Sequence, residues 1–401
     1  MAETADVVVV GGGVVGASVA FHLAGRGRRI VLCERRFVAA GATGKSGALV
    51  RMHYTNEPEA RLAIASFPYF QHWNDLVGHG SSGFVNTGML RLVAPEHEGR
   101  LRANVTMLQR LGARTTIIGR DAVHALVPAW RTEDIDWAAH EPESGVADPV
   151  ATTHGFIEGA RARGADVRIG TAVTGVRAAH GRVEAVDTSG GAIAAGAVVI
   201  AGGAWAVPLL RSLGVPFELR PVRIQVAVFR RPPELSAPHP VCIDGTNYMW
   251  LRPEGPEFAS TLVGIGQRQP LDDPEQLDEG VDAGYVEQAK ARLARRIPAI
   301  AYAPMRGGWA GAITLTADGK PVIDRHPDVE GLWLCTGDNG TSFKTAPAVG
   351  RAVAEWVTDG TPSTVPLHPF RASRYREGAP IVGEFEYGDY PTEASGPVMV
   401  G

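Results

Sequence analysis

The first 34 residues carry the pattern that most constrains how this chain folds. Four valines at 7–10 lead directly into a turn with glycines at positions 11, 12, 13 and 16. An apolar stretch of helical character follows at 14–23, and a second apolar run at 30–33 ends in Glu34. Strand, glycine turn, helix, strand and acid in this order are typical of the βαβ unit that binds an adenine dinucleotide. The sequence therefore predicts a parallel sheet flanked by helices, a Rossmann-type α/β domain.

The glycine spacing gives each position in this turn a separate role. Gly11 permits the tight turn, Gly13 lets the backbone approach a pyrophosphate, and Gly16 lets the helix lie close to the strand. The N–H groups at the start of the helix face the phosphate charge, and Glu34 accepts hydrogen bonds from ribose hydroxyls. A tight turn that binds no ligand is the alternative. The further predicted contacts of the dinucleotide are Val14, Val15 and Arg35.

The length and charge of the chain limit its domains and its partners. At 401 residues it exceeds what one hydrophobic core usually holds, so two domains are expected. The formal net charge of −4 gives no overall attraction to nucleic acid or to an anionic membrane. No apolar run approaches the ~20 residues of a membrane span, and no basic segment followed by a long apolar run begins the sequence. We therefore expect a cytoplasmic protein with no nucleic-acid or membrane partner.

Cysteine and lysine are both rare in this chain. The three cysteines, Cys33, Cys242 and Cys335, are odd in number, and buried thiols are expected rather than disulfides or metal ligands. No metal site is predicted. Only four of the 39 basic residues are lysine, at positions 45, 290, 320 and 344. Because arginine fills the other basic positions, each lysine suggests a need for a compact, titratable ammonium group.

The pattern along the chain predicts two domains that alternate in sequence. Apolar and polar residues alternate at 222–228, as in a half-solvated antiparallel strand, whereas the runs at 197–201 and 331–335 are those of short buried strands. The stretch 57–76 has the apolar period of one long helix. We expect a dinucleotide-binding domain at 1–80, 145–220 and 318–370, an antiparallel-sheet substrate domain at 81–144 and 221–317, and a C-terminal tail without an assignable pattern at 371–401.

Four later motifs accompany the N-terminal turn. They read GATGKSG at 41–47 followed by Arg51, GVADP at 145–149, AGGAW at 201–205 and GDNGTSFKTAP at 337–347. With these motifs the chain resembles, over nearly its whole length, the flavoprotein family of D-amino-acid oxidase, glycine oxidase, monomeric sarcosine oxidase and dimethylglycine dehydrogenase. The last motif is the most specific, because a similar glycine-rich segment ending in Phe-Lys lies against the flavin ring in the sarcosine-oxidase branch. The resemblance implies FAD, rather than NAD, as the cofactor.

The resemblance also implies how FAD is held. A helix beginning near Ala346 presents its positive end to the flavin, although an ordinary glycine-rich loop before a helix is the alternative. No cysteine occurs at 308–318, where covalently flavinylated relatives have one, so FAD is expected to bind non-covalently. The implied contacts outside the N-terminal turn are Thr43, Gly44, Lys45, Ser46, Gly47, Val173, Gly202, Trp205, Gly311, Gly337, Asn339, Gly340, Thr341, Ser342, Phe343 and Lys344.

The implied reaction is oxidation of the carbon–nitrogen bond of a small secondary amine or amino acid. Hydride passes to flavin N5, water hydrolyses the imine, and O2 is the expected acceptor, giving H2O2. Lys344 and Arg51 are the candidates for holding a substrate carboxylate, and a structural role for Arg51 on backbone carbonyls or FAD is an equal alternative. Tyr54, Tyr248 and Trp250 are expected to line the pocket, with core packing as the alternative for each.

Two other functions stay open on the sequence alone. The first is an FAD-dependent amine dehydrogenase that uses a protein or quinone acceptor, because the lysine that relatives use with oxygen has no clear counterpart near 248–251. The second is a non-catalytic, flavin-bearing subunit of a larger complex. An NAD-linked dehydrogenase is disfavoured, because the C-terminal glycine loop has no role in that design.

Overall fold

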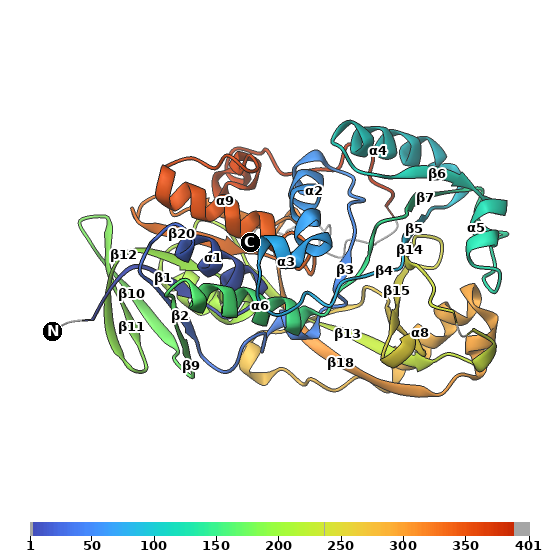
Figure 1. Cartoon of the computed structure of the whole chain (residues 1–401), viewed down its shortest axis with the longest axis horizontal. Helices are drawn as coiled ribbons and strands as arrows, with labels where there is room; N and C mark the ends of the chain where they lie inside the picture. The colour runs from blue at the N-terminus through green and yellow to red at the C-terminus, as the bar shows by residue number, and fades with distance from the viewer. Residues whose placement is uncertain (1–2, 236, 389–401) are drawn as a thin grey trace, which may run out of the picture.

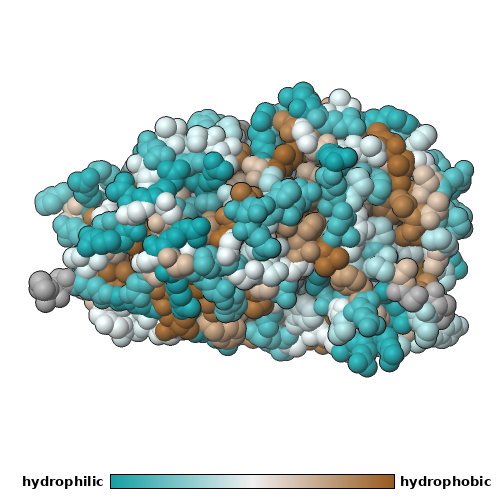
Figure 2. Space-filling view, in the orientation of Figure 1, coloured by the Kyte–Doolittle hydropathy of each residue, from teal (hydrophilic) through white to brown (hydrophobic). Residues whose placement is uncertain are grey.

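Two large sheets organise the molecule. The structure, a computed structural model, describes residues 3–235 and 237–388. Figure 1 shows the half that contains α1, α6 and α9 at one end and the half that contains α5 and α8 at the other. Hydrophilic residues cover much of the face in Figure 2, with apolar residues interspersed. No helix within the described ranges is both long enough and apolar enough to cross a bilayer.

The first sheet has a parallel centre around the N-terminal strand. β12 (Gly191–Ile200), β1 (Glu3–Val10), β2 (Ile30–Glu34) and β9 (Asp166–Ile169) are neighbours in this order and run parallel. β20 (Leu332–Thr336) pairs parallel with the other edge of β12, and β19 (Val322–Arg325) pairs antiparallel with β20. The chain therefore returns to this sheet near its C-terminal end. The Rossmann-type fold predicted from the N-terminal motif is confirmed.

Both faces of the N-terminal strand are buried, which explains its unbroken valine run. Val7 and Val9 belong to the core beneath the helices, and Val8 and Val10 belong to the core on the opposite face. The helices on the first face are α1 (Val14–Ala24), α6 (Pro149–Ala162) and α9 (Ala346–Asp359) (Figure 1). The opposite face is covered by α7 (Val207–Ser212) and by the hairpin of β10 (Val173–Ala179) and β11 (Arg182–Thr188).

The second sheet is mostly antiparallel and combines two separate stretches of chain. β18 (Met305–Leu315) pairs with β13 (Arg220–Arg230) along nearly its whole length. β14 (Val241–Asp244) lies parallel to β5 (Met89–Leu92), which joins the later stretch to the earlier one. The other strands are β6 (Thr116–Gly119), β7 (Trp137–Glu141), β15 (Met249–Glu254), β16 (Ser260–Gly264) and β17 (Arg268–Pro270). The helices of this half are α4 (Glu98–Arg110), α5 (Arg120–Leu126) and α8 (Ala283–Arg296).

A short three-stranded sheet and a broken helix connect the two halves. The strands are β3 (Leu49–Val50), β8 (Gly145–Val146) and β4 (Val85–Asn86). The prediction of one helix at 57–76 is wrong, because α2 (Glu57–Gln71) and α3 (Trp73–Leu76) meet at His72. His72 has φ −125° and ψ 43°, and Pro68 in the last turn of α2 has no N–H to continue the helical hydrogen bonds.

The C-terminal segment packs on the body of the protein. After α9 the short helical turns η8 (His368–Phe370) and η9 (Ala372–Tyr375) precede a stretch that continues to residue 388. Arg374 in η9 is fully buried, and Tyr387 in the stretch that follows is 3% exposed. The tail predicted at 371–401 is therefore packed through residue 388, and the rest of it lies outside the described residues.

Candidate cofactor and substrate site

A cavity of about 1280 Å³ is lined by residues of both large sheets. The glycine turn that follows β1 lines one part of it, and the loop between β20 and α9 lines another. The sequence-predicted residues that line it are Gly11, Gly13, Val14, Val15, Glu34, Arg35, Thr43, Lys45, Ser46, Gly47, Arg51, Tyr54, Val173, Gly202, Trp205, Trp250, Gly311, Gly337, Asn339, Gly340, Thr341, Ser342, Phe343 and Lys344. Segments more than 300 positions apart therefore meet at one site.

The glycine turn brings strand, helix and cavity wall close together. Gly11 has φ 105°, and a Cβ there would lie 2.6 Å from the carbonyl oxygen of Ala201. A Cβ at Gly16 would lie 2.0 Å from the Gly11 carbonyl oxygen, so glycine is needed for α1 to begin here. Gly13 is the N-cap of α1 and places no side chain over its amides. This end of the cavity is therefore suited to phosphate groups.

Glu34 and Trp205 offer polar groups at the same end. The two oxygens of Glu34 accept hydrogen bonds from the Gly12 and Arg36 amides, each at 2.7 Å, which fixes the carboxylate at the end of β2. The indole N–H of Trp205 is buried and has no partner within the part of the chain that the structure describes. The guanidinium of Arg35 lies 5.3 Å from the centre of the Trp205 ring. A fixed carboxylate and an unpaired donor are both suited to a polar ligand.

The loop at 41–47 is held by contacts with the second sheet. The Nζ atom of Lys45 forms an ion pair with Glu279, and its carbonyl oxygen accepts a hydrogen bond from Trp309 Nε1 at 2.9 Å. A Cβ at Gly47 would lie 2.4 Å from the Trp250 ring, so the loop packs directly against that indole. Lys45 therefore lines the cavity while its ammonium group is paired with a residue of the second half.

The loop between β20 and α9 is shaped by left-handed backbone and by internal hydrogen bonds. Gly337, Asn339 and Gly340 have φ values of 67°, 48° and 75°. Asn339 Nδ2 donates to the Gly337 carbonyl oxygen at 2.6 Å. The half-buried Asp338 accepts from two backbone amides at 3.2 Å, and desolvation of its carboxyl raises the pKa to about 6. The prediction that a helix begins near Ala346 is confirmed, so its N-terminus faces this loop.

Two cationic side chains surround the ring of Tyr54. The guanidinium carbon of Arg51 lies 4.7 Å from the ring centre, and Lys344 Nζ lies 5.4 Å from it. The Tyr54 hydroxyl and Arg51 Nε are buried without a hydrogen-bond partner among residues 3–235 and 237–388. Arg51 also donates to the carbonyl oxygen of His53. This contact is of the kind expected if Arg51 has a structural role on backbone carbonyls. These groups face the cavity with unused hydrogen-bonding capacity.

Lys344 is the most strongly perturbed cation of the site. It is 7% exposed, and its Nζ donates to the carbonyl oxygen of Thr341 at 3.0 Å. Burial lowers the pKa of Lys344 well below its ordinary value, and the charge of Arg51 lowers it further, while Glu59 opposes the shift. A carboxylate bound here would be an anionic partner for Lys344 and would stabilise its charged ammonium form.

Several lining residues were not found from the sequence. Lys320 Nζ forms an ion pair with Glu59 Oε2 at 2.9 Å, and both residues line the cavity. The scarcity of lysine singles out Lys320, but nothing local indicates its partner on α2. The C-terminal segment contributes a further set without any sequence signal, namely Tyr375, Gly378, Pro380, Ile381, Val382, Glu386 and Tyr387.

Three predicted site residues do not line the cavity. Tyr248 precedes β15 in a turn with φ 51°, and its side chain is 46% exposed, so its prediction as a pocket residue is wrong. The strand begins one residue later, which leaves Trp250 facing the site. Gly16 does not line the cavity but lets α1 begin close to the Gly11 carbonyl oxygen. Gly44 allows its loop to fold closely on itself, since a Cβ there would lie 2.5 Å from the Ala39 carbonyl oxygen.

The cysteines are buried, as the sequence predicts. Cys33, Cys242 and Cys335 are free thiols, and burial raises the pKa of Cys335 to about 12. No group of three or more His, Cys, Asp or Glu side chains with the spacing of a metal site occurs in the described ranges.

Comparison with known proteins identifies relatives along the whole chain. The sequence model of the family described as FAD dependent oxidoreductase matches residues 6–356. The chain is 27% identical over 383 residues to glycine oxidase of Geobacillus kaustophilus (strain HTA426), covering 94% of this chain and 98% of that protein. It is 25% identical over 399 residues to mitochondrial dimethylglycine dehydrogenase of Rattus norvegicus, covering 93% of this chain and 45% of that protein. The solved structure of L-proline dehydrogenase from P. horikoshii is similar with a TM-score of 0.87 and 26% identity, covering 95% of this chain and 100% of that chain.

The residues of the cavity fit the cofactor of this family. The glycine turn, the fixed Glu34 carboxylate and the unpaired Trp205 N–H suit the dinucleotide portion of FAD. The loop at 337–345 and the N-terminus of α9 suit the flavin portion. The protein is therefore an enzyme with FAD as its cofactor. By sequence and by fold, the chain belongs to the FAD dependent oxidoreductase family.

Proposed function

We propose that this enzyme oxidises the carbon–nitrogen bond of a small amino acid or secondary amine that carries a carboxylate. The observation that carries the proposal is the pair of cations, Lys344 and Arg51, that lie against the ring of Tyr54 and line the cavity. A buried ammonium group and a half-buried guanidinium whose buried Nε has no hydrogen-bond partner in the described ranges are suited to an anionic partner. A substrate carboxylate supplies one and is oriented by the same contact.

The chain's own residues bind and orient, while the redox chemistry belongs to the cofactor. FAD, when bound, accepts a hydride from the carbon that bears the amine, which leaves an imine that water hydrolyses. Lys344 and Arg51 hold the carboxylate, and the ring of Tyr54 packs against both cations. The hydride can leave this carbon only when the attached amine is neutral. Burial in this cavity disfavours the ammonium form of the substrate. The protein therefore contributes position, charge and exclusion of water.

The relatives support an amino-acid substrate. Their names give glycine, dimethylglycine and L-proline as the compounds they act on. All three are small amino acids with one carboxylate close to the amine. The chain spans about the whole length of the glycine oxidase but only 45% of the dimethylglycine dehydrogenase, so the proposal concerns the chemistry shared at the flavin site.

An anaerobic substrate screen tests this proposal. Glycine, N-methylglycine, N,N-dimethylglycine and L-proline are mixed with the oxidised enzyme, and loss of flavin absorbance is followed. Pyrrolidine is the control for L-proline, because it has the same ring without the carboxylate. We expect at least one amino acid to bleach the flavin and pyrrolidine to fail. Equal bleaching by pyrrolidine would contradict carboxylate recognition, and no bleaching by any amine would favour a non-catalytic role.

For the electron acceptor we propose O2, with H2O2 as the reduced product. The glycine oxidase that matches along 98% of its length supports an oxidase. Relatives named dehydrogenases support the second candidate, an enzyme that uses a protein or quinone acceptor. Mixing the substrate-reduced enzyme with air-saturated buffer separates the two. Prompt return of flavin absorbance with stoichiometric H2O2 is expected, whereas slow return that a quinone accelerates would favour the dehydrogenase.

A further inference from the structure

The C-terminal segment lines the cavity, although it lies beyond residue 356, where the match to the family model ends. The segment contributes Ile381, Val382, Glu386 and Tyr387 to the cavity wall. Glu386 accepts a hydrogen bond from Thr55 Oγ1 at 2.9 Å. Thr55 follows Tyr54, whose ring contacts Lys344 and Arg51. The segment therefore lies beside the residues that carry the proposed carboxylate-binding cations.

Tyr387 is held in place by contacts on several sides. Its hydroxyl lies 2.9 Å from His53 Nε2, and the two rings are stacked with their centres 6.0 Å apart. The guanidinium carbon of Arg91 lies 4.4 Å from the Tyr387 ring centre. From α4, Asn104 Nδ2 donates to the carbonyl oxygen of Phe385 at 2.9 Å. A bulky ring with 3% exposure is thus fixed at the cavity wall.

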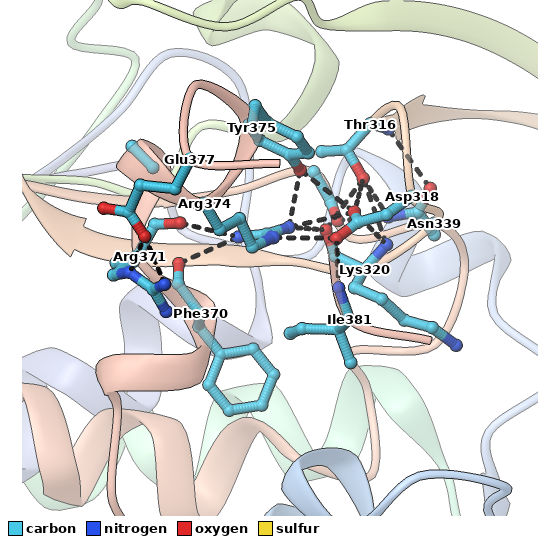
Figure 3. A network of polar contacts seen from close by, with 12 residues as sticks. Thr316, Asp318, Lys320, Asn339, Phe370, Arg371, Arg374, Tyr375, Glu377 and Ile381 are labelled. Atoms are coloured by element: carbon cyan, nitrogen blue, oxygen red, sulfur yellow. Dashed lines mark hydrogen bonds and ion pairs between the residues drawn. The ribbon is translucent and has the colours of Figure 1, made fainter. Parts of the chain in front are cut away.

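A buried ion pair anchors the start of this segment. Arg374 Nε and Nη2 donate to the two carboxylate oxygens of Asp318 at 2.7 and 3.0 Å, and the side chains are 0% and 4% exposed. Asp318 also accepts from the Ile381 amide at 3.1 Å and from the Tyr375 hydroxyl at 3.0 Å (Figure 3). Lys320, two residues after Asp318, pairs with Glu59 in the cavity. The pair therefore ties the C-terminal segment to the loop that carries Lys320.

We propose that residues 379–387, anchored by the Arg374–Asp318 pair, form the wall that limits the bulk of the substrate, with Tyr387 as the side chain that sets the limit. This rests on the proposed function, because the substrate is taken to be an amino acid held by Lys344 and Arg51. Substrates with a short N-alkyl group or a short side chain fit against the wall. Longer or aromatic groups would have to displace a ring that His53 and Arg91 hold.

Substitution of Tyr387 tests the wall directly. Binding of acetate, butanoate, hexanoate and phenylacetate is followed through the flavin absorbance, together with the anaerobic reduction rate for N-methylglycine and N-benzylglycine. Tyr387→Ala is expected to improve binding of the bulky carboxylates over acetate by about tenfold or more, and to shift the N-benzyl to N-methyl rate ratio in the same direction. Tyr387→Phe keeps the ring and is expected to keep both profiles. Selectivity of Tyr387→Ala within about twofold of the unchanged enzyme would overturn the proposal.

The anchor is tested with a matched pair of substitutions in the same segment. Arg374→Met removes the buried pair, whereas Arg371→Met removes the more exposed pair with Glu377. Arg374→Met is expected to speed hydrogen exchange at the Ile381 and Glu384 amides by about tenfold and to relax selectivity as Tyr387→Ala does. Arg371→Met is expected to change neither. Unchanged exchange and selectivity in Arg374→Met would refute the anchoring role.

These readouts separate the inference from the proposed function. The carboxylate series and the exchange rates do not depend on turnover, so the wall is tested even if no amine reduces the flavin. Arg374→Lys provides a second variant if Arg374→Met does not fold, because it keeps the charge beside Asp318 but loses the two-point contact. A rise in exchange at Ile381 in this variant supports the anchor, and an unchanged rate contradicts it.

Discussion

Replacement of Lys344 by methionine would isolate the charge on which the proposed carboxylate recognition depends. Lys344 is 7% exposed, and its nearest acceptor is the Thr341 carbonyl oxygen at 3.0 Å. Methionine fills a similar volume without the ammonium group. Losing one partner of a buried, hydrogen-bonded charge pair costs about 2–5 kcal/mol of binding free energy. At about 1.4 kcal/mol per tenfold change, acetate binding should weaken about 30-fold to several thousand-fold.

The pH dependence of acetate binding provides a second, independent test of the role of Lys344. Burial and the charge of Arg51 lower the pKa of Lys344, so the ligand-free enzyme releases this proton at a lower pH than an exposed lysine would. A bound carboxylate favours the charged form and raises the pKa again. Binding should therefore take up protons, and affinity should fall as the pH rises above the pKa of Lys344 in the free enzyme. In Lys344→Met both effects should vanish.

The same shift predicts that the substitution does not destabilise the ligand-free fold. A lysine whose pKa is lower in the folded state than in the unfolded state binds fewer protons when folded, so its contribution to stability is unfavourable at low pH and is relieved as the pH rises. Methionine removes this unfavourable contribution at neutral pH. The midpoint of thermal unfolding of Lys344→Met should equal or exceed that of the unchanged protein.

Titration calorimetry in two buffers of different ionisation enthalpy measures both the affinity and the proton uptake. Lys290→Met is the matched control, because Lys290 lies on α8 and outside the cavity wall. It should bind acetate as the unchanged enzyme does. Acetate affinity within about threefold in Lys344→Met, with proton uptake retained, would refute the assignment of Lys344 to the substrate carboxylate.

Three further substitutions and one treatment test the cofactor site and the second half. Gly16→Ala should prevent FAD uptake or folding, because the added Cβ would lie 2.0 Å from a carbonyl oxygen, and flavin fluorescence after gel filtration measures this. Glu34→Gln should weaken FAD binding by about 10–100-fold, since a charge-assisted hydrogen bond contributes about 1.5–3 kcal/mol. Acid precipitation should leave FAD in the supernatant, and yellow colour in the pellet would contradict non-covalent binding. Arg296→Met should lower the free energy of unfolding by about 3–5 kcal/mol, because it leaves the buried carboxylate of Asp244 unpaired; urea unfolding measures this, with the exposed Arg295→Met as control.

The dinucleotide end of the site could be predicted because its determinants are local. The spacing of Gly11, Gly13 and Gly16 fixes the turn and the start of α1, and Glu34 follows in the next strand. The glycines act through backbone geometry and Glu34 acts through its carboxylate, and all four belong to one βαβ unit. The loop before α9 was assigned to the flavin from the family resemblance of its motif, and the helix predicted to follow it begins at Ala346.

The substrate end could not be predicted in full because its contacts join distant residues. Lys320 pairs with Glu59 across 261 positions, and neither residue has a local pattern that indicates the other. Tyr387 lies in a segment without apolar periodicity, and only the folded structure brings it to His53. The error at Tyr248 has a different origin, because β15 begins at Met249 and Tyr248 lies in the preceding turn with φ 51°, so its side chain does not share the strand face of Trp250.

The two ends of the cavity therefore respond differently to sequence change. At the dinucleotide end a single methyl group on Gly16 meets a backbone oxygen, so the tolerance for substitution is set by the fold itself. At the proposed substrate end Lys344, Arg51 and Tyr387 come from three different segments and line one cavity with side chains, which can change without altering the sheets. Relatives that are about 26% identical to this chain are named for action on different amino acids, so one fold supports several substrates. Substrate choice in this chain should accordingly be sought at Tyr387 and its anchor, where the wall is made by residues beyond the family match.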